Sequence, residues 1–121
     1  MIQNEKDFFD WLDAQLETEI PNQIVAFNIN IYESPFKIEV VGSNVFDIDD
    51  EDWACNEDWV PLNRMTSVSS SIFGKSWEQA QENLLHMAKN YFDSNSRNSR
   101  KLRSAKAFAL GFVDGNLEYV A

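Results

Sequence analysis

The sequence predicts an α+β fold: an antiparallel sheet of about four strands, built from two hairpins, with two to three helices packed on one face. Two stretches repeat apolar residues at helical spacing, and four short stretches alternate apolar and polar residues. They follow one another as helix, hairpin, helix, hairpin, which is typical of a compact layered domain. Because 121 residues is near the commonest domain size, residues 1–121 are expected to form a single domain.

The first helix is expected over residues 5–19. Its apolar residues recur every fourth position: Phe8, Leu12 and Leu16. Asn4 is a suitable N-cap, and Pro21 is expected to end the helix. The outer face would be acidic, through Asp10, Asp13, Glu17 and Glu19.

The first hairpin is expected to pair residues 23–32 with residues 36–42 across a turn that contains Pro35. Apolar residues occupy alternate positions in both stretches, so each strand should bury one face. Asn28 and Asn30 fall on the opposite face of the first strand, which is expected to be wet or loosely covered.

Residues 66–76 are rich in serine and threonine and are expected to be a loop. A helix should follow over 77–93, because Ser76 and Gln79 have the spacing of a capping box. Its expected buried stripe is Trp77, Ala80, Leu84, Ala88 and Tyr91.

The basic segment 97–106 is expected to be a short helix or an arm. The second hairpin should pair 107–113 with 116–120. Asp114-Gly115 predicts its two-residue type I′ turn, which needs positive φ at both central positions.

Composition narrows the possible functions. The chain is 44% hydrophobic and 13% aromatic, which is enough for a packed core and argues against disorder. Its formal net charge of −10 should repel nucleic acid and anionic membranes and attract basic proteins. No apolar run is long enough to span a membrane, and the first residues do not resemble a signal peptide. The single cysteine excludes an internal disulfide and fits a cytoplasmic protein.

Residues 46–59, FDIDDEDWACNEDW, concentrate seven carboxylates and two tryptophans. Asp47, Asp49 and Glu51 alternate like the first ligands of a calcium loop. The match then fails, because Asp52 stands where the loop needs glycine and Asp58 where it needs glutamate. A looser carboxylate site for Mg²⁺ or Ca²⁺ remains open, but no cofactor is expected.

Nothing in the sequence favours catalysis. Cys55 lies among carboxylates, which disfavour a thiolate, so we expect it to be a small buried residue. His86, the only histidine, is expected on a helix face near solvent. The chain has no phosphate-binding glycine loop and no hydrolase or metalloprotease motif, so an enzyme is the minority interpretation.

Binding of a basic partner is the leading interpretation. Active sites that bind phosphates are lined by lysine, arginine and histidine, and a rigid array of carboxylates can mimic those phosphates. Trp53 and Trp59 would add aromatic anchors, although one of the two is expected to pack in the core. The expected partner-binding residues are Asp47, Asp49, Asp50, Glu51, Asp52, Trp53, Glu57, Asp58 and Trp59. A merely solvated acidic loop is the competing explanation.

Two stretches carry a resemblance to known proteins: Asp52 to Trp59, DWACNEDW, and Gly111 to Glu118, GFVDGNLE. With them the chain resembles the immunity proteins of bacterial polymorphic toxin systems, including contact-dependent growth inhibition. The resemblance is best over 23–60 and 105–120. It implies a non-enzymatic, tight, stoichiometric partner of a basic toxin domain, often a nuclease, kept in the cytoplasm. An adaptor for another basic protein and a small carboxylate-dependent metal enzyme remain the alternatives. The sequence does not indicate an oligomeric state.

Overall fold

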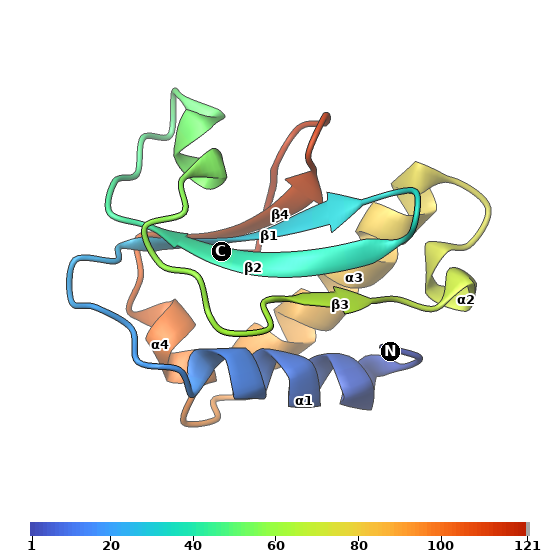
Figure 1. The fold of residues 1–121 in the computed structure, drawn as a ribbon, viewed down its shortest axis with the longest axis horizontal. Coiled ribbons are helices and arrows are strands. Elements are labelled where there is room, and N and C mark those ends of the chain that lie inside the picture. Colours follow the sequence, from blue (N-terminus) through green and yellow to red (C-terminus); the bar gives the residue numbers. More distant parts are fainter. Residues whose placement is uncertain (121) are drawn as a thin grey trace.

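The computed structural model of the chain describes residues 1–120 and has an α+β fold with a five-stranded mixed sheet (Figure 1). The elements are, in chain order, α1 (Glu5–Leu16), β1 (Ala26–Tyr32), β2 (Lys37–Ser43), the 3₁₀ helix η1 (Glu51–Cys55), β3 (Met65–Ser67), α2 (Ser70–Phe73), α3 (Trp77–Asp93), α4 (Ser99–Arg103), β4 (Ala107–Phe112) and β5 (Glu118–Tyr119). Among residues 1–120, no helix has the length and apolar character needed to cross a membrane.

The strand order is β3-β2-β1-β4-β5, and both expected hairpins form. The α+β class is as expected, and the sheet differs in two details from the expected antiparallel sheet of about four strands. β1 and β4 pair in parallel, with Ala26 opposite Ala107 and Ile31 opposite Phe112. A fifth strand, β3, adds to the edge of β2 from a segment expected to be a loop. Both differences have one cause, since these pairings join segments far apart in the chain.

The sheet separates two unequal layers. Figure 1 shows α1, α3 and α4 below the sheet and η1 above it. Below the sheet, alternate strand residues such as Phe27 and Ile29 pack in the main core against helix residues such as Leu12 of α1 and Leu84 of α3. Above it, a smaller cluster contains Ala26, Trp53, Ala54, Ala107 and Ala109. The upper face of the sheet therefore has an apolar end under η1, and its other end is polar.

The helix ends follow local chemistry. The Asn4 side chain caps α1 by accepting a 2.9 Å hydrogen bond from the Asp7 amide. α1 stops at Leu16, short of the expected residue 19, because the Thr18 amide donates to Gln15 three residues back and closes the last turn. α3 spans the predicted residues, and Ser76 caps it through the Gln79 amide. The Gln79 side chain accepts from the Lys75 amide, one residue before the position that a capping box uses.

The second hairpin does not contain the predicted type I′ turn. The Gly115 amide donates a 2.9 Å hydrogen bond to the Phe112 carbonyl, which places Val113 and Asp114 at the centre of the turn. Neither Asp114 nor Gly115 has positive φ; within residues 1–120, Gly74 is the only glycine that does. The longer connection reaches over the sheet, and a Cβ at Gly111 would lie 2.8 Å from the carbonyl oxygen of Asn116. The loop thus forms a wall above β4.

Candidate protein-binding surface

The acidic stretch lies over one end of the sheet and is held by its two tryptophans, Trp53 in the small cluster above the sheet and Trp59 in the main core below it. Trp53 lies in η1 and is 3% exposed. Its ring meets Phe46 edge-on, with centroids 5.4 Å apart, and also lies against Tyr119. Trp53 therefore closes the small apolar cluster under η1.

Trp59 fixes the other end of the stretch. It is 4% exposed, it meets Phe27 edge-on at 5.6 Å, and its backbone pairs with that of Gly42. A Cβ at Gly42 would lie 2.8 Å from Ile24 Cγ2 and 3.2 Å from Trp59 Cβ, so only glycine allows this approach. Both Trp53 and Trp59, where only one was expected in the core, are therefore buried by internal packing.

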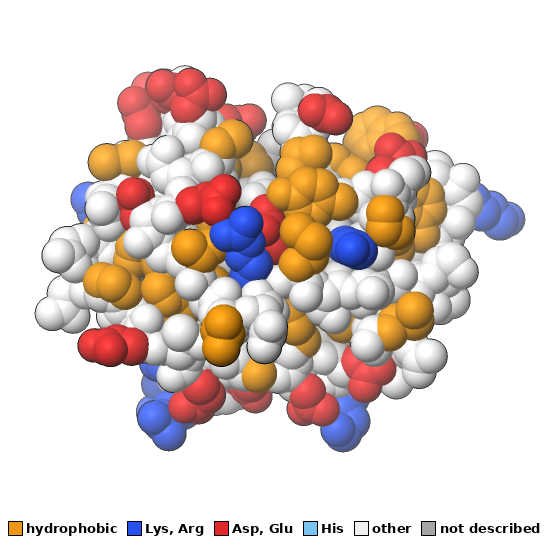
Figure 2. All heavy atoms as spheres, viewed as in Figure 1, with side chains coloured by type: hydrophobic (Ala, Val, Ile, Leu, Met, Phe, Trp, Pro, Cys, Tyr) orange, Lys and Arg blue, Asp and Glu red, His pale blue; other side chains and the backbone are white. Residues whose placement is uncertain are grey.

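The seven carboxylates of the stretch are all exposed. Three of them also shape the loop by accepting backbone hydrogen bonds of 2.8–3.0 Å: Asp47 from Asp49, Asp50 from Asp52, and Asp58 from Asn44. These bonds hold the backbone while the charges face solvent. Figure 2 shows the result as a cluster of acidic side chains at the upper left, over the η1 loop drawn in Figure 1.

A polar pocket lies beside η1 on the upper face of the sheet. Its floor consists of side chains from β1 and β2: Asn28, Asn30, Tyr32 and Glu39. One wall is the η1 segment, with Glu51, Asp52, Ala54, Cys55 and Glu57; the other is the β4–β5 connection, with Val113, Gly115 and Leu117. Four carboxylates line this pocket and no lysine, arginine or histidine does.

Glu39 is the centre of the pocket floor. It is 3% exposed, and its carboxylate accepts hydrogen bonds from Asn30, at 3.1 Å, and from the Tyr32 hydroxyl. Arg64 Nε lies 2.8 Å from Glu39 Oε2, and Arg64 Nη1 donates to Glu57 at 2.6 Å. One cation thus joins the buried floor to the exposed rim. Burial, aided by the hydrogen bond to Glu39, raises the pKa of Tyr32 to about 12.

Asn28 adds an unused acceptor to this floor. It is 1% exposed, and its amide nitrogen donates to Asn30 at 2.8 Å and to the Ala54 carbonyl at 3.3 Å. Its Oδ1 has no hydrogen-bond donor among residues 1–120. A buried acceptor without a partner costs free energy.

Sequence reasoning did not identify the pocket floor as a site. It placed Asn28 and Asn30 on one face of a strand but did not combine them with Glu39 of the next strand. The hairpin register places Asn30 directly opposite Glu39, so this pair was accessible from the sequence. Arg64 was not, because it returns from beyond the acidic stretch.

The two residues considered for catalysis lie apart. Cys55 is exposed on the wall of the pocket, which corrects the expectation that it is buried. Ala54 takes the buried position beside it, because the single turn of η1 points only Trp53 and Ala54 at the sheet. His86 is exposed on α3, as expected.

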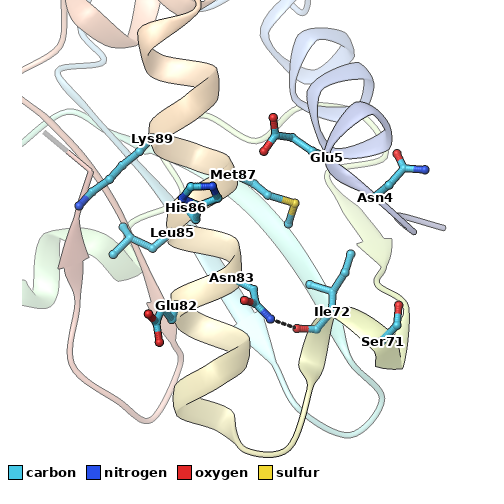
Figure 3. Close-up of a pocket in the computed structure, with 10 residues that line it drawn as sticks. All are labelled: Asn4, Glu5, Ser71, Ile72, Glu82, Asn83, Leu85, His86, Met87 and Lys89. Carbon is cyan, nitrogen blue, oxygen red and sulfur yellow. Dashed lines mark hydrogen bonds between the residues drawn. The ribbon is translucent and has the colours of Figure 1, made fainter.

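His86 lines a second groove between α1, α2 and α3 (Figure 3). Here Asn83 donates a 2.8 Å hydrogen bond to the Ile72 carbonyl. The Asn90 amide lies 2.9 Å from a Glu5 oxygen and 3.3 Å from His86 Nε2. The polar groups of this groove therefore bond to one another, and its charges are mixed in sign.

Within residues 1–120, no three or more histidine, cysteine or acidic side chains are grouped so that they could hold a metal ion. The carboxylates of 46–59 therefore offer no ready-made metal centre. Comparison with known protein families, with curated proteins and with solved structures finds no match to this chain.

Proposed function

We propose that this protein is a non-enzymatic acidic binding protein that neutralises a basic toxin domain by tight, stoichiometric binding. The observation that carries the proposal is that most of the exposed carboxylates of residues 46–59 have no cationic partner among residues 1–120. Of the seven in residues 46–59, only Glu57 has a cationic partner among residues 1–120. Asp47, Asp49, Asp50, Glu51, Asp52 and Asp58 have none.

Unpaired like charges on a fixed loop repel one another and reduce stability. A basic partner removes this repulsion and is also drawn toward the surface over a distance of about 10 Å at 0.1 M salt. Glu51 and Asp52 on the wall of the polar pocket have no cationic partner among residues 1–120 and extend the same field into a concavity, whereas Glu39 and Glu57 are paired with Arg64. This arrangement suits a partner that inserts a lysine or arginine.

A nuclease toxin domain fits this description, because its active site presents cations that bind phosphate. We place the neutralisation in the cytoplasm. Cys55 is the only cysteine, and its thiol is exposed and free, which suits a reducing compartment.

Capture from a lysate of the source strain tests the proposal, with a tagged chain washed first at low and then at high salt. The test variant combines Asp49→Asn, Asp50→Asn and Asp52→Asn. The matched control removes three charges from the helical side with Asp10→Asn, Glu82→Gln and Asp93→Asn. We expect one basic protein to survive the high-salt wash, to be lost with the test variant and to be kept by the control.

Co-expression of the captured partner then separates a toxin from another basic protein. A toxin should stop growth unless the wild-type chain is present. A harmless partner would favour the adaptor alternative. A spread of basic proteins, all removed by salt and by both variants alike, would contradict a specific binding surface.

A further inference from the structure

Trp77 is the tryptophan that the structure leaves exposed. The predicted stripe of α3 placed it inside, but as the first residue of the helix it lies beyond the end of the core and is 52% exposed. Its ring meets Phe112 edge-on, with centroids 6.1 Å apart, and Phe112 in turn contacts Phe73. The indole is thus supported from one side and open on the other.

Trp77 lines a groove with the end of β1 and the β4–β5 connection. Its lining includes Tyr32, Glu33, Phe112, Val113, Asp114 and Gly115. Two carboxylates, Glu33 and Asp114, stand at this groove, and both are exposed without a cationic partner among residues 1–120. No lysine or arginine lines it, and Lys75, two residues before Trp77, is not part of the lining.

An open indole beside two unpaired carboxylates is complementary to a cation. The face of tryptophan attracts cations more strongly than any other aromatic side chain. A guanidinium group is planar, so it can stack on the indole while its edge donates hydrogen bonds to carboxylates. A lysine ammonium is more strongly hydrated and has no planar face to stack.

We propose that Trp77, Glu33 and Asp114 form a binding site for an arginine side chain of a partner protein. The groove shares Tyr32, Phe112, Val113 and Gly115 with the polar pocket, so one basic surface can cover both sites at once. The inference relies on the proposed function only for the identity of that partner. Trp77 then provides the exposed aromatic anchor of the interface, which is the role that the sequence suggested for Trp53 and Trp59.

The site can be tested without the partner, by NMR titration of the indole N–H signals with Nα-acetyl-arginine amide. The Trp77 signal is assigned from its loss in Trp77→Phe. We expect it to shift in a saturable manner at millimolar probe, with the buried Trp53 and Trp59 signals unchanged. Nα-acetyl-citrulline amide, the uncharged isostere, serves as the matched probe and should produce no shift.

The combined variant Glu33→Gln and Asp114→Asn should weaken probe binding about tenfold. The control variant Asp10→Asn and Asp93→Asn, which also removes two charges, should leave it unchanged. Equal shifts with arginine and citrulline probes, or equal weakening by both double variants, would overturn the site. If the lysate capture recovers no toxin, the proposed function is contradicted, but the result of this titration, and the arginine site that it tests, are unaffected.

Discussion

The indole nitrogen of Trp59 donates a 2.9 Å hydrogen bond to the backbone carbonyl oxygen of Glu19, 40 residues earlier in the chain. This bond ties the end of the acidic stretch to the segment that follows α1. Together with the contact between Trp59 and Phe27, it makes the position of the acidic loop depend on the main core.

Replacing Trp59 should therefore affect the whole fold. Trp59→Ala removes a buried ring and leaves a cavity, which we expect to lower the free energy of unfolding by about 3–5 kcal/mol. Trp77→Ala, at a half-exposed ring, should lower it by only about 1 kcal/mol. Urea denaturation of both variants measures the difference. Similar losses in the two would show that Trp59 is not a core anchor.

Gly42 should not tolerate even a methyl group. Gly42→Ala places a Cβ 2.8 Å from Ile24 Cγ2, against the Trp59 side chain, and should cost about 1–3 kcal/mol. Gly115→Ala is the matched control, because its nearest non-bonded atoms would lie at 3.6 Å and its φ is not positive. Thermal unfolding should separate the two variants, and equal melting temperatures would contradict the close packing.

Stability should fall in alkali through Tyr32. Its pKa is raised in the folded state from 10.0 to about 12, so the native state favours the protonated hydroxyl. The corresponding stabilisation is complete below pH 10 and is lost as the pH rises through about 12. We expect Tyr32→Phe to show a shallower decline than wild type across this window.

Tyr91 provides a comparison, because burial and its hydrogen bond to Asp13 raise its pKa as well. Tyr91→Phe should also reduce the alkaline decline, and the double variant should reduce it further. Urea titrations between pH 9 and pH 12 measure all three. A slope unchanged by either substitution would show that these hydroxyls do not carry the effect.

The electrostatic field of the polar pocket can be measured at Cys55, which lies exposed on its wall. A cationic methanethiosulfonate reagent should modify this thiol faster than an anionic one at low salt. The preference should largely vanish in about 1 M salt, where the Debye length is about 3 Å. Changing Glu51 and Asp52 to Gln and Asn should reduce the preference, and changing Asp10 and Asp93 to Asn should not. Equal rates for the two reagents at low salt would contradict a negative pocket.

The elements predicted correctly are those determined by neighbouring residues. α1 and α3 follow from helical spacing and a polar N-cap, and the two hairpins follow from alternation around short turns. The parallel pairing of β1 with β4 and the edge strand β3 depend on distant segments, which no local pattern contains.

The candidate site shows the same division. The exposure of the seven carboxylates was predictable, because isolated charges avoid burial. The burial of Trp53 and Trp59 and the exposure of Trp77 were not, because hydrophobicity alone does not say which aromatic side chain the core has room for. Trp77 fits the periodic stripe of α3, but as the first residue of that helix it meets Phe112 at the very end of β4 and is left half-exposed.

The β1–β4 pairing also sets an order of events during synthesis on the ribosome. β1 occupies the middle of the sheet, yet Ala26 meets its partner Ala107 only when 81 further residues have been made. Until then the edge of β1 that β4 covers in the folded protein stays open, and other chains could join it. Pulse-labelled hydrogen exchange should find the amides of β1 that face β4 protected last. A nascent chain of this protein is thus exposed to aggregation for most of its translation, and a chaperone that shields strand edges should raise its yield.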